Sequence, residues 1–283
     1  MFSLGRSIRL GSTVTALLLV TACSAGNRSA ETLAAPVHLA AVPAAEYAFP
    51  SAWAGDYTFQ WSAADGIDLT GPESTVVRAL AESKRLSLSV GDRLAYPGYS
   101  QAVSQVGWLH IPDGGSYPAG AREGDWQLRW AGTFLARILQ VDPNDHGFTA
   151  AYCLDFGNVA ESDDGGKSYH WRPTREDGET ARGWVRWLNV TAPHGESQAT
   201  SMPTDTGGPV HRAPRFNVFD GWTVTDAWGP SPQREADTAE ADGCTQWTQS
   251  NPHAEPPIVT SAEGREPVTP PVAQPPAPGW PVT

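Results

Sequence analysis

The sequence has little lysine and little cysteine, and it has no long apolar run beyond its first 22 residues. Lys84 and Lys167 are the two lysines among 19 basic residues, which face 31 acidic ones and leave a formal net charge of −12. Nucleic-acid binders need a basic patch to displace counterions, so this balance argues against a nucleic-acid partner. A retained transmembrane helix needs about 20 apolar residues and is therefore not expected.

Motifs for common catalytic and metal sites are also absent. The chain has no Gly-x-Ser-x-Gly, His-Glu-x-x-His or Ser-x-x-Lys motif and no phosphate-binding glycine loop. Residues 142–147 begin like a calcium loop, but Cys153 stands where the closing Glu belongs, so we interpret them as a hairpin turn. The seven histidines show no ligand spacing. We expect no cofactor and no metal.

The first 22 residues have the three parts of an export signal. Arg6 and Arg9 precede an apolar run over residues 14–20, and small residues follow. The stretch Leu-Leu-Leu-Val-Thr-Ala-Cys, ending at Cys23, resembles a bacterial lipobox. The resemblance implies that Cys23 becomes the first mature residue and carries a diacylglycerol that anchors the protein to the cell membrane. The alternative is an ordinary secretory signal in which Cys23 is an incidental thiol. The scarcity of lysine is typical of a GC-rich genome, as in actinobacteria.

The remaining chain divides by composition. After the signal peptide (1–22), residues 23–46 are rich in Ala and predict a flexible tether behind the lipidated Cys23. Residues 47–250 predict a single α+β domain. Residues 251–283 contain ten prolines and predict a disordered, solvated tail, with a ligand for a proline-binding groove as the alternative.

Residues 72–90 carry the best helix signal. Pro72 suits a first helical turn, Glu73 lies at the positive end of the helix dipole, and Gly91 offers a stop. Apolar residues recur at helical spacing, while Arg78, Glu82 and Arg85 are predicted on the opposite face. Such a helix needs an apolar partner, most simply a sheet.

Several later segments predict antiparallel strands. Residues 127–141 and 148–156 flank a turn and predict a hairpin whose inward face carries large apolar residues, and residues 56–61 alternate as an edge strand does. Trp184 and Trp187 have opposite parity, which predicts that both faces of their strand are covered. Asp220-Gly221 predicts a second hairpin between residues 216–219 and 222–228. Together these segments predict a sheet of four to six antiparallel strands.

Cys153 and Cys244 remain once Cys23 is lipidated. Two cysteines in an exported protein most simply form a disulfide. Cys153 has the opposite parity to Tyr152 and Leu154, so the bridge is expected on the other face of the sheet.

The helix Pro-Glu-x-Thr-Val-Val-Arg-Ala-Leu-Ala-Glu, the long antiparallel strands and the closing Asp-Gly-Trp-x-Val-x-Asp strand resemble the NTF2-like or SnoaL-like arrangement. The resemblance covers residues 73–228 and implies a curved sheet that wraps a helix and leaves a conical cavity. That family has two or three helices, so residues 87–106 would have to supply the others. A cystatin-like helix on a sheet and a β-sandwich are the alternatives.

Strand parity selects Asp226 as the candidate acid. Alternation places Trp222, Val224 and Asp226 on one face, where a desolvated carboxylate would have the raised pKa of a general base. This supports one hypothesis, an NTF2-like cavity enzyme that uses Asp226 as acid/base with Tyr152 or His170 as a helper.

The preferred hypothesis is a non-catalytic, lipid-anchored binding or accessory domain of the cell envelope. Its ligand would be a protein, a glycan or a small apolar molecule, since large aromatic side chains exceed what one helix can cover. The candidate ligand-binding residues are Tyr152, Trp184, Trp222 and Asp226.

Overall fold

The computed structural model describes residues 47–109, 128–171, 183–192, 211–229, 238–252 and 266–281. All of them belong to one compact unit, Ala40–Thr283. The signal, the lipobox and the tether lie outside the described residues, as do parts of the loops between strands.

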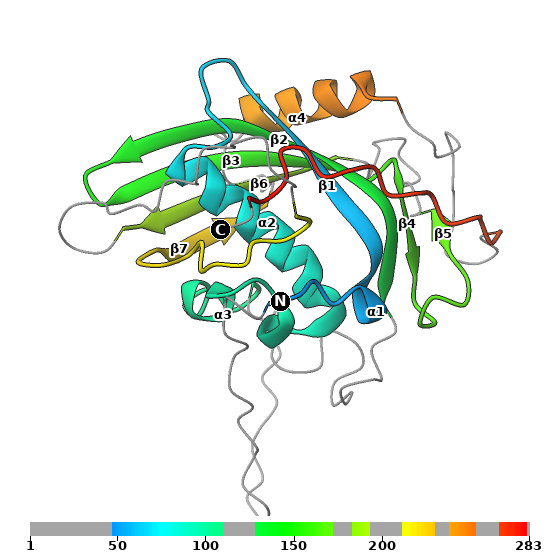
Figure 1. Ribbon diagram of the computed structural model, residues 1–283. Coiled ribbons are helices and arrows are strands. Elements are labelled where there is room, and N and C mark those ends of the chain that lie inside the picture. The colour runs from blue at the N-terminus through cyan, green and yellow to red at the C-terminus, as the bar shows by residue number, and fades with distance from the viewer. Residues whose placement is uncertain are drawn as a thin grey trace, which may run out of the picture. The chain divides into compact units, whose positions relative to one another are not determined.

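A single seven-stranded sheet forms the framework (Figure 1). Hydrogen-bonded neighbours follow the order β5-β4-β2-β3-β6-β7. Strand β1 lies off this path and pairs with β2. The predicted α+β class with a mostly antiparallel sheet is confirmed. The prediction of four to six strands, all antiparallel, is corrected in two respects. The described sheet has seven strands, and β1 pairs with β2 in parallel. The strands are β1 Gly55–Ala63, β2 Arg129–Asn144, β3 Gly147–Asp155, β4 Val159–Ser162, β5 His170–Trp171, β6 Gly183–Thr191 and β7 Thr223–Trp228.

The antiparallel hairpin of β2 and β3 confirms the sequence prediction. Ile138 lies opposite Tyr152 and Ala136 opposite Leu154, so alternate residues of both strands enter the main core. The residues of the calcium-like segment form the end of β2 and the turn. Figure 1 shows these long strands bending around the central helix.

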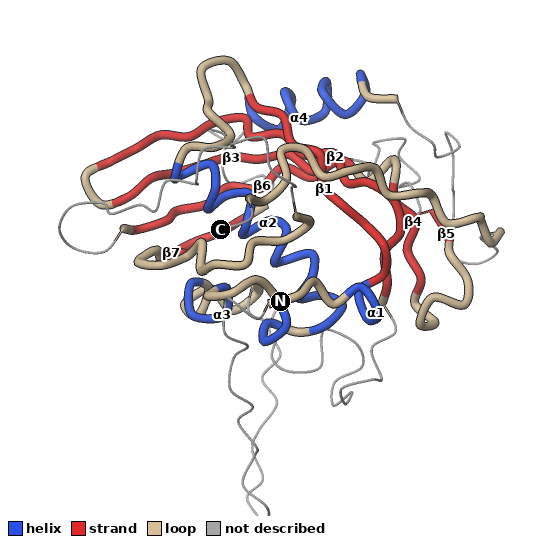
Figure 2. Tube along the Cα trace, in the orientation of Figure 1, coloured by secondary structure: helices blue, strands red, loops and turns tan. Residues whose placement is uncertain are grey.

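Helix α2, Pro72–Val90, lies against the concave face of the sheet (Figure 2). It begins with Pro72 at its first turn and ends before Gly91, both as predicted. The other helices are short: α1 Ser51–Ala54, a 3-10 turn Asp92–Leu94, α3 Tyr99–Ala102 and α4 Thr238–Ser250. Within the described residues, no helix combines the length and the apolar character that crossing a membrane requires.

The predicted polar face of α2 is buried, which corrects the sequence interpretation. Arg78, Glu82 and Arg85 are exposed by 0%, 3% and 5%. Arg78 donates to the carbonyl oxygens of Leu69 and Pro278, and the Arg85 guanidinium lies within 6 Å of four aromatic rings. Backbone carbonyl groups and aromatic rings therefore take the place of water around the polar side chains of this helix.

The C-terminal segment 266–281 provides part of that cover, so the expectation of a solvated tail does not hold for these residues. Val268 bridges to Tyr169, and Ala277 exchanges backbone hydrogen bonds with Phe59 and Trp61 at the free edge of β1. Trp280 is then buried to 1% exposure. Prolines do not prevent this path, because the segment bonds the sheet through few N–H groups.

The outer face of the sheet carries the disulfide and α4. Cys153 on β3 and Cys244 on α4 form the predicted pair, with Cα atoms 5.5 Å apart. They pack with Val185 and Trp187 in a small apolar cluster separate from the main core, which confirms that both faces of β6 are covered. The polar segment around Cys244 is a helix, which the sequence analysis did not predict.

The second predicted hairpin is wrong. Residues 216–222 form turns, and β7 pairs with β6 instead. The register of β6 and β7 shifts, because Asn189 lies opposite Asp226 while Val190 lies opposite Val224. One extra residue, Thr225, therefore interrupts the alternation, and Asp226 moves to the face opposite Val224.

Candidate functional site

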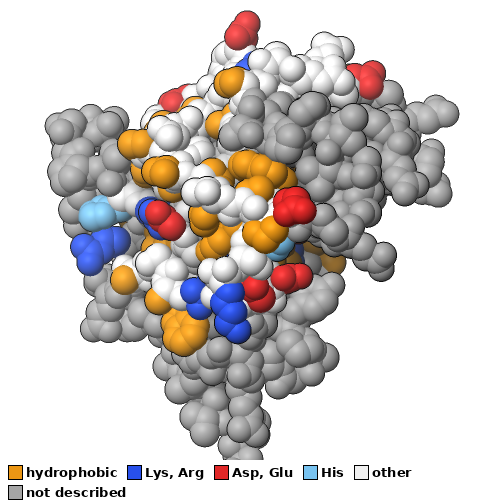
Figure 3. Space-filling view, turned by 90° about the vertical axis from the view of Figure 1, so that its right-hand side faces the viewer, with side chains coloured by type: hydrophobic (Ala, Val, Ile, Leu, Met, Phe, Trp, Pro, Cys, Tyr) orange, Lys and Arg blue, Asp and Glu red, His pale blue; other side chains and the backbone are white. Residues whose placement is uncertain are grey.

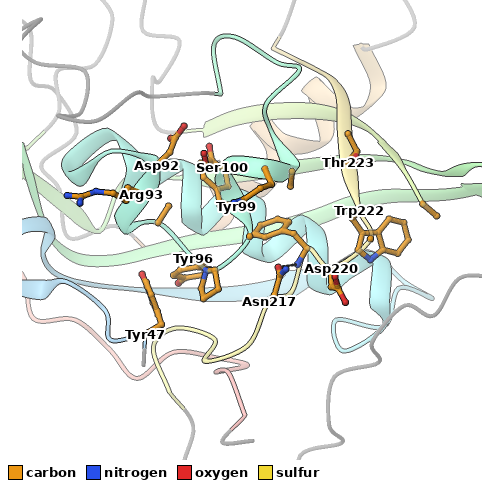
Figure 4. Close-up of a pocket in the computed structure, with 18 residues that line it drawn as sticks. Tyr47, Asp92, Arg93, Tyr96, Tyr99, Ser100, Asn217, Asp220, Trp222 and Thr223 are labelled. Atoms are coloured by element: carbon orange, nitrogen blue, oxygen red, sulfur yellow. Dashed lines mark hydrogen bonds between the residues drawn. The ribbon is translucent and has the colours of Figure 1, made fainter. Parts of the chain in front are cut away.

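The described residues line an open cleft of about 720 Å³ beside the C-terminal end of α2. Four parts of the chain form it: Tyr47, the segment from Asp92 to Ala102 after α2, Ala192 after β6, and the segment from Asn217 to Thr223 that leads into β7. Figure 4 shows the rings of Tyr96 and Tyr99 between Tyr47 on one side and Trp222 on the other.

A close approach between two turns shapes the cleft. Gly98 has a left-handed φ of 85°, and a Cβ atom there would lie 1.9 Å from the Asn217 side-chain oxygen. That oxygen accepts a hydrogen bond from the Phe219 backbone N–H at 3.0 Å. Gly98 is thus required both for its own conformation and for the position of the loop that carries Trp222.

The three tyrosines of the cleft have their hydroxyl groups committed to the protein. Tyr47 donates to the Leu94 carbonyl oxygen at 3.1 Å, and Tyr99 donates to that of Leu109 at 2.9 Å. Tyr96 donates to a carboxylate oxygen of Glu82 at 2.6 Å. Burial raises the pKa of all three phenols well above the usual value, and nearby acids raise it further. Tyr47, Tyr96 and Tyr99 are only 5%, 3% and 0% exposed, so they support the cleft from within the core and hold their protons.

Glu82 lies below the cleft in a fully buried position. Its carboxylate accepts hydrogen bonds from Trp61 Nε1 at 2.8 Å, from Trp280 Nε1 at 2.9 Å and from Tyr96. Burial raises the pKa of Glu82, while the Arg78 charge and these three donors act in the opposite direction. The carboxylate ties α2, β1 and the C-terminal segment together, and its oxygens point to buried donors.

The polar groups at the edge of the cleft are Asp92, Arg93, Ser100, Asn217 and Asp220. They can orient a ligand through charge and hydrogen bonds. Among the described lining residues, no nucleophile has a histidine or cysteine partner, because the lining contains neither residue type. The arrangement suits binding of a small molecule that makes hydrogen bonds to these polar groups.

The structure places one of the predicted ligand-binding residues in this cleft. Trp222 lines it and packs edge-to-face on Phe148, with ring centroids 5.3 Å apart. Tyr152 is buried under α2 near Trp61, and burial raises its pKa. Trp184 packs on Phe156 at the other end of β6.

Asp226 does not lie in the cleft. Because of the shift at Thr225, it shares the outer face with its cross-strand partner Asn189 and accepts a hydrogen bond from the Ala227 N–H at 2.9 Å. His170 lies on β5, at the opposite end of the strand order from β7. The structure therefore separates the three residues of the proposed acid/base set.

Sequence reasoning missed Tyr96, Tyr99 and Asn217. Pro97-Gly98 is typical of a turn, and no local pattern indicates that the flanking Tyr96 and Tyr99 are buried beside a cleft. Asn217 was assigned to a strand of the second hairpin, and no local signal contradicted that assignment.

On the side of β4 and β5, the charged side chains of the described residues do not form one large patch (Figure 3). In Figure 3 the described Lys and Arg side chains are scattered over this face, with hydrophobic side chains near its middle. Across the described ranges, no three His, Cys, Asp or Glu side chains are arranged to hold a metal ion.

Comparison of the chain with protein-family models, with curated proteins and with solved structures gave no match.

Proposed function

We propose that this chain is an exported lipoprotein, anchored to the cell membrane through Cys23, whose folded domain binds a small ligand in the cleft without catalysing a reaction. The anchor rests on the lipobox resemblance, and two acyl chains suffice for stable membrane attachment. The ligand role rests on the cleft itself.

The observation that carries the binding role is an open space of about 720 Å³ with exposed polar side chains above a packed aromatic base. This volume lies within the range of about 300–1,000 Å³ typical of small-molecule sites. Tyr96, Tyr99 and Trp222 are 3%, 0% and 7% exposed, and the hydroxyl bonds of the two tyrosines and the packing of Trp222 fix the base of the cleft before a ligand arrives. A preformed site binds its ligand with little loss of entropy. A sugar or another small ring compound fits this chemistry, and a protein side chain inserted from a partner fits it as well.

The proposal also includes a specific fold for the domain, the NTF2-like arrangement. The helix on a bent sheet and the short helical turns at Asp92–Leu94 and Tyr99–Ala102 support an NTF2-like arrangement, because the resemblance required extra helices in this part of the chain. A cystatin-like arrangement shares the helix and the sheet.

The alternative is a cavity enzyme with Asp226 as acid/base. The position of Asp226 on the outer face and the commitment of the cleft tyrosines both favour binding over catalysis.

Native mass spectrometry of the lipidated protein, extracted from its own envelope, tests the binding role. We expect a bound small molecule that is lost in Ser100→Phe, since Ser100 lines the cleft and a ring there would fill it. Asp226→Asn is the matched control on the outer face and should retain the molecule with unchanged thermal stability. Retention in Ser100→Phe would contradict the cleft, and loss of cellular function in a stable Asp226→Asn protein would favour the enzyme.

The anchor has its own test. Cys23→Ala should block diacylglycerol transfer and leave the protein uncleaved or released from the membrane fraction. Mass spectrometry that finds a mature amino terminus other than a lipidated Cys23 would contradict the lipoprotein assignment and leave the cleft unaffected.

A further inference from the structure

A second group of side chains lies between α2 and β6. Lys84 on α2 and Arg186 on β6 both lie over the ring of Trp108, with Nζ 5.6 Å and Cζ 5.8 Å from its centroid. Arg186 also lies 4.9 Å from the centroid of Trp184, and Arg85 lies 5.8 Å from the same ring. We call Lys84, Trp108, Trp184 and Arg186 the Trp108 cluster.

The cluster concentrates positive charge in partly buried surroundings. Burial, together with the smaller effects of the Arg85 and Arg186 charges, lowers the pKa of Lys84 to about 8, and the charge of Asp92 acts in the opposite direction. Burial also lowers the pKa of Arg186. Indole faces attract cations, which offsets part of the cost of holding these charges near each other. A negatively charged ligand would offset the rest.

Both cations are positioned by the backbone. Lys84 Nζ donates to the carbonyl oxygens of Trp108 at 2.7 Å and Leu109 at 3.3 Å, which leaves one of its three N–H groups. Arg186 Nη1 donates to the Val185 carbonyl oxygen at 2.9 Å, and that is the one hydrogen bond of its guanidinium to the described residues. These fixed donors can bind an oxyanion without rearranging, and the planar guanidinium group of arginine matches the spacing of the oxyanion's oxygens.

The charge count favours a dianion over a monoanion. Lys84 and Arg186 bring two positive charges to the ring of Trp108, and the charge of Asp92 acts to raise the pKa of Lys84. A phosphate monoester carries about −1.5 to −2 at neutral pH, whereas a carboxylate carries −1. Trp108 is 44% exposed, so it also offers a ring face beside the cations.

We infer that the Trp108 cluster is a second ligand site that takes a phosphate monoester, with its oxygens on Lys84 and Arg186 and its organic group on the ring of Trp108. The site is distinct from the cleft. The Leu109 carbonyl oxygen lies between the two, because it accepts hydrogen bonds from Lys84 and from the cleft residue Tyr99.

The two lysines of the chain allow a direct test. Acetylation of the folded protein at pH 7 can be followed at each lysine by peptide mass spectrometry, with the exposed Lys167 as the control within the same molecule. Only the neutral amine reacts, so a bound phosphate that raises the pKa of Lys84 by one unit lowers its rate about tenfold. We expect millimolar phenyl phosphate to slow Lys84 and to leave Lys167 unchanged.

Comparison of phenyl phosphate with two other anions identifies the ligand chemistry. Inorganic phosphate should protect Lys84 at higher concentration than phenyl phosphate does, and phenylacetate should protect it little. Equal protection by phenylacetate would overturn the choice of a phosphate, and no protection of Lys84, or equal slowing of both lysines, would overturn the site.

Variants supply a second readout. Arg186→Gln should abolish protection by phenyl phosphate, whereas Arg137→Gln, which lies opposite Cys153 on the outer face, should retain it. Full protection in a folded Arg186→Gln protein would overturn the role of Arg186. The measurement on the unaltered chain decides the main inference even if a variant does not fold.

Discussion

Replacing Trp280 with Ala tests whether the C-terminal segment is part of the core. The Trp280 ring is 1% exposed, lies 5.9 Å from the Tyr96 ring and supports the Arg78 guanidinium at 4.7 Å. Removal of a buried Trp side chain costs about 3–5 kcal/mol through lost burial and the cavity that remains. The lost hydrogen bond to Glu82 also removes one of three donors from a buried carboxylate. We therefore expect Trp280→Ala to lower the free energy of unfolding by about 4 kcal/mol or more.

Trp280→Phe separates the two contributions. Phe fills much of the same space but cannot donate to Glu82, so this variant should lose about 1.5–3 kcal/mol, the usual value for a hydrogen bond to a charged group. Val272→Ala is the control in the same segment, because Val272 is 80% exposed and its truncation should change stability by less than about 0.5 kcal/mol.

Urea unfolding of the three variants, monitored by fluorescence and by circular dichroism, provides the free energies. For a unit of this size, 4 kcal/mol also corresponds to a fall of roughly 8–16 °C in Tm. A loss below about 1 kcal/mol in Trp280→Ala would refute the reasoning, since no fully buried Trp in a closed core is so inexpensive to remove. Equal losses in Trp280→Ala and Val272→Ala would show that the segment is detached from the core in solution.

Two further predictions concern the disulfide and Lys84. Cys153 and Cys244 are separated by 91 residues, so the chain-entropy relation predicts that their double replacement with Ala lowers the free energy of unfolding by about 4–5 kcal/mol. Urea midpoints of the two proteins that coincide would contradict the bridge. Lys84 has a folded pKa of about 8 and an unfolded value near 10.5, so the unfolded chain binds more protons between these values and stability rises with pH across that window. Lys84→Met should lack this rise, and melting curves at pH 7.5 and pH 10 check the difference, whose absence would contradict the lowered pKa.

The sequence predicted those parts of the fold that local periodicity determines. The α2 helix has a Pro start, a Gly stop and a regular apolar stripe, and the β2–β3 hairpin has two alternating runs around a turn, so each contains its own evidence. The partner of Cys153 followed from counting cysteines. These features need no knowledge of distant contacts.

Long-range contacts explain the errors. Arg78 and Glu82 look like a solvated helix face until a segment about 200 residues away bonds to them, and Arg85 looks solvated until aromatic rings of distant strands surround it. Asp226 looked inward because simple alternation ignores the extra residue Thr225, and the register shift that contains it depends on pairing with β6. The cleft combines Tyr96 and Trp222 from turns at distant positions, which periodicity does not bring together.

The burial of Trp280 also has a consequence for biosynthesis. Its contacts with α2 join residues separated by 198 positions, so the main core cannot close until the residues up to Trp280 have been made. Until then β1 presents an open edge, which is a template for pairing with other chains. Contacts of such long sequence separation slow folding. A chain without residues 266–281 would keep the edge of β1 open and would be a preferred substrate for chaperones and proteases.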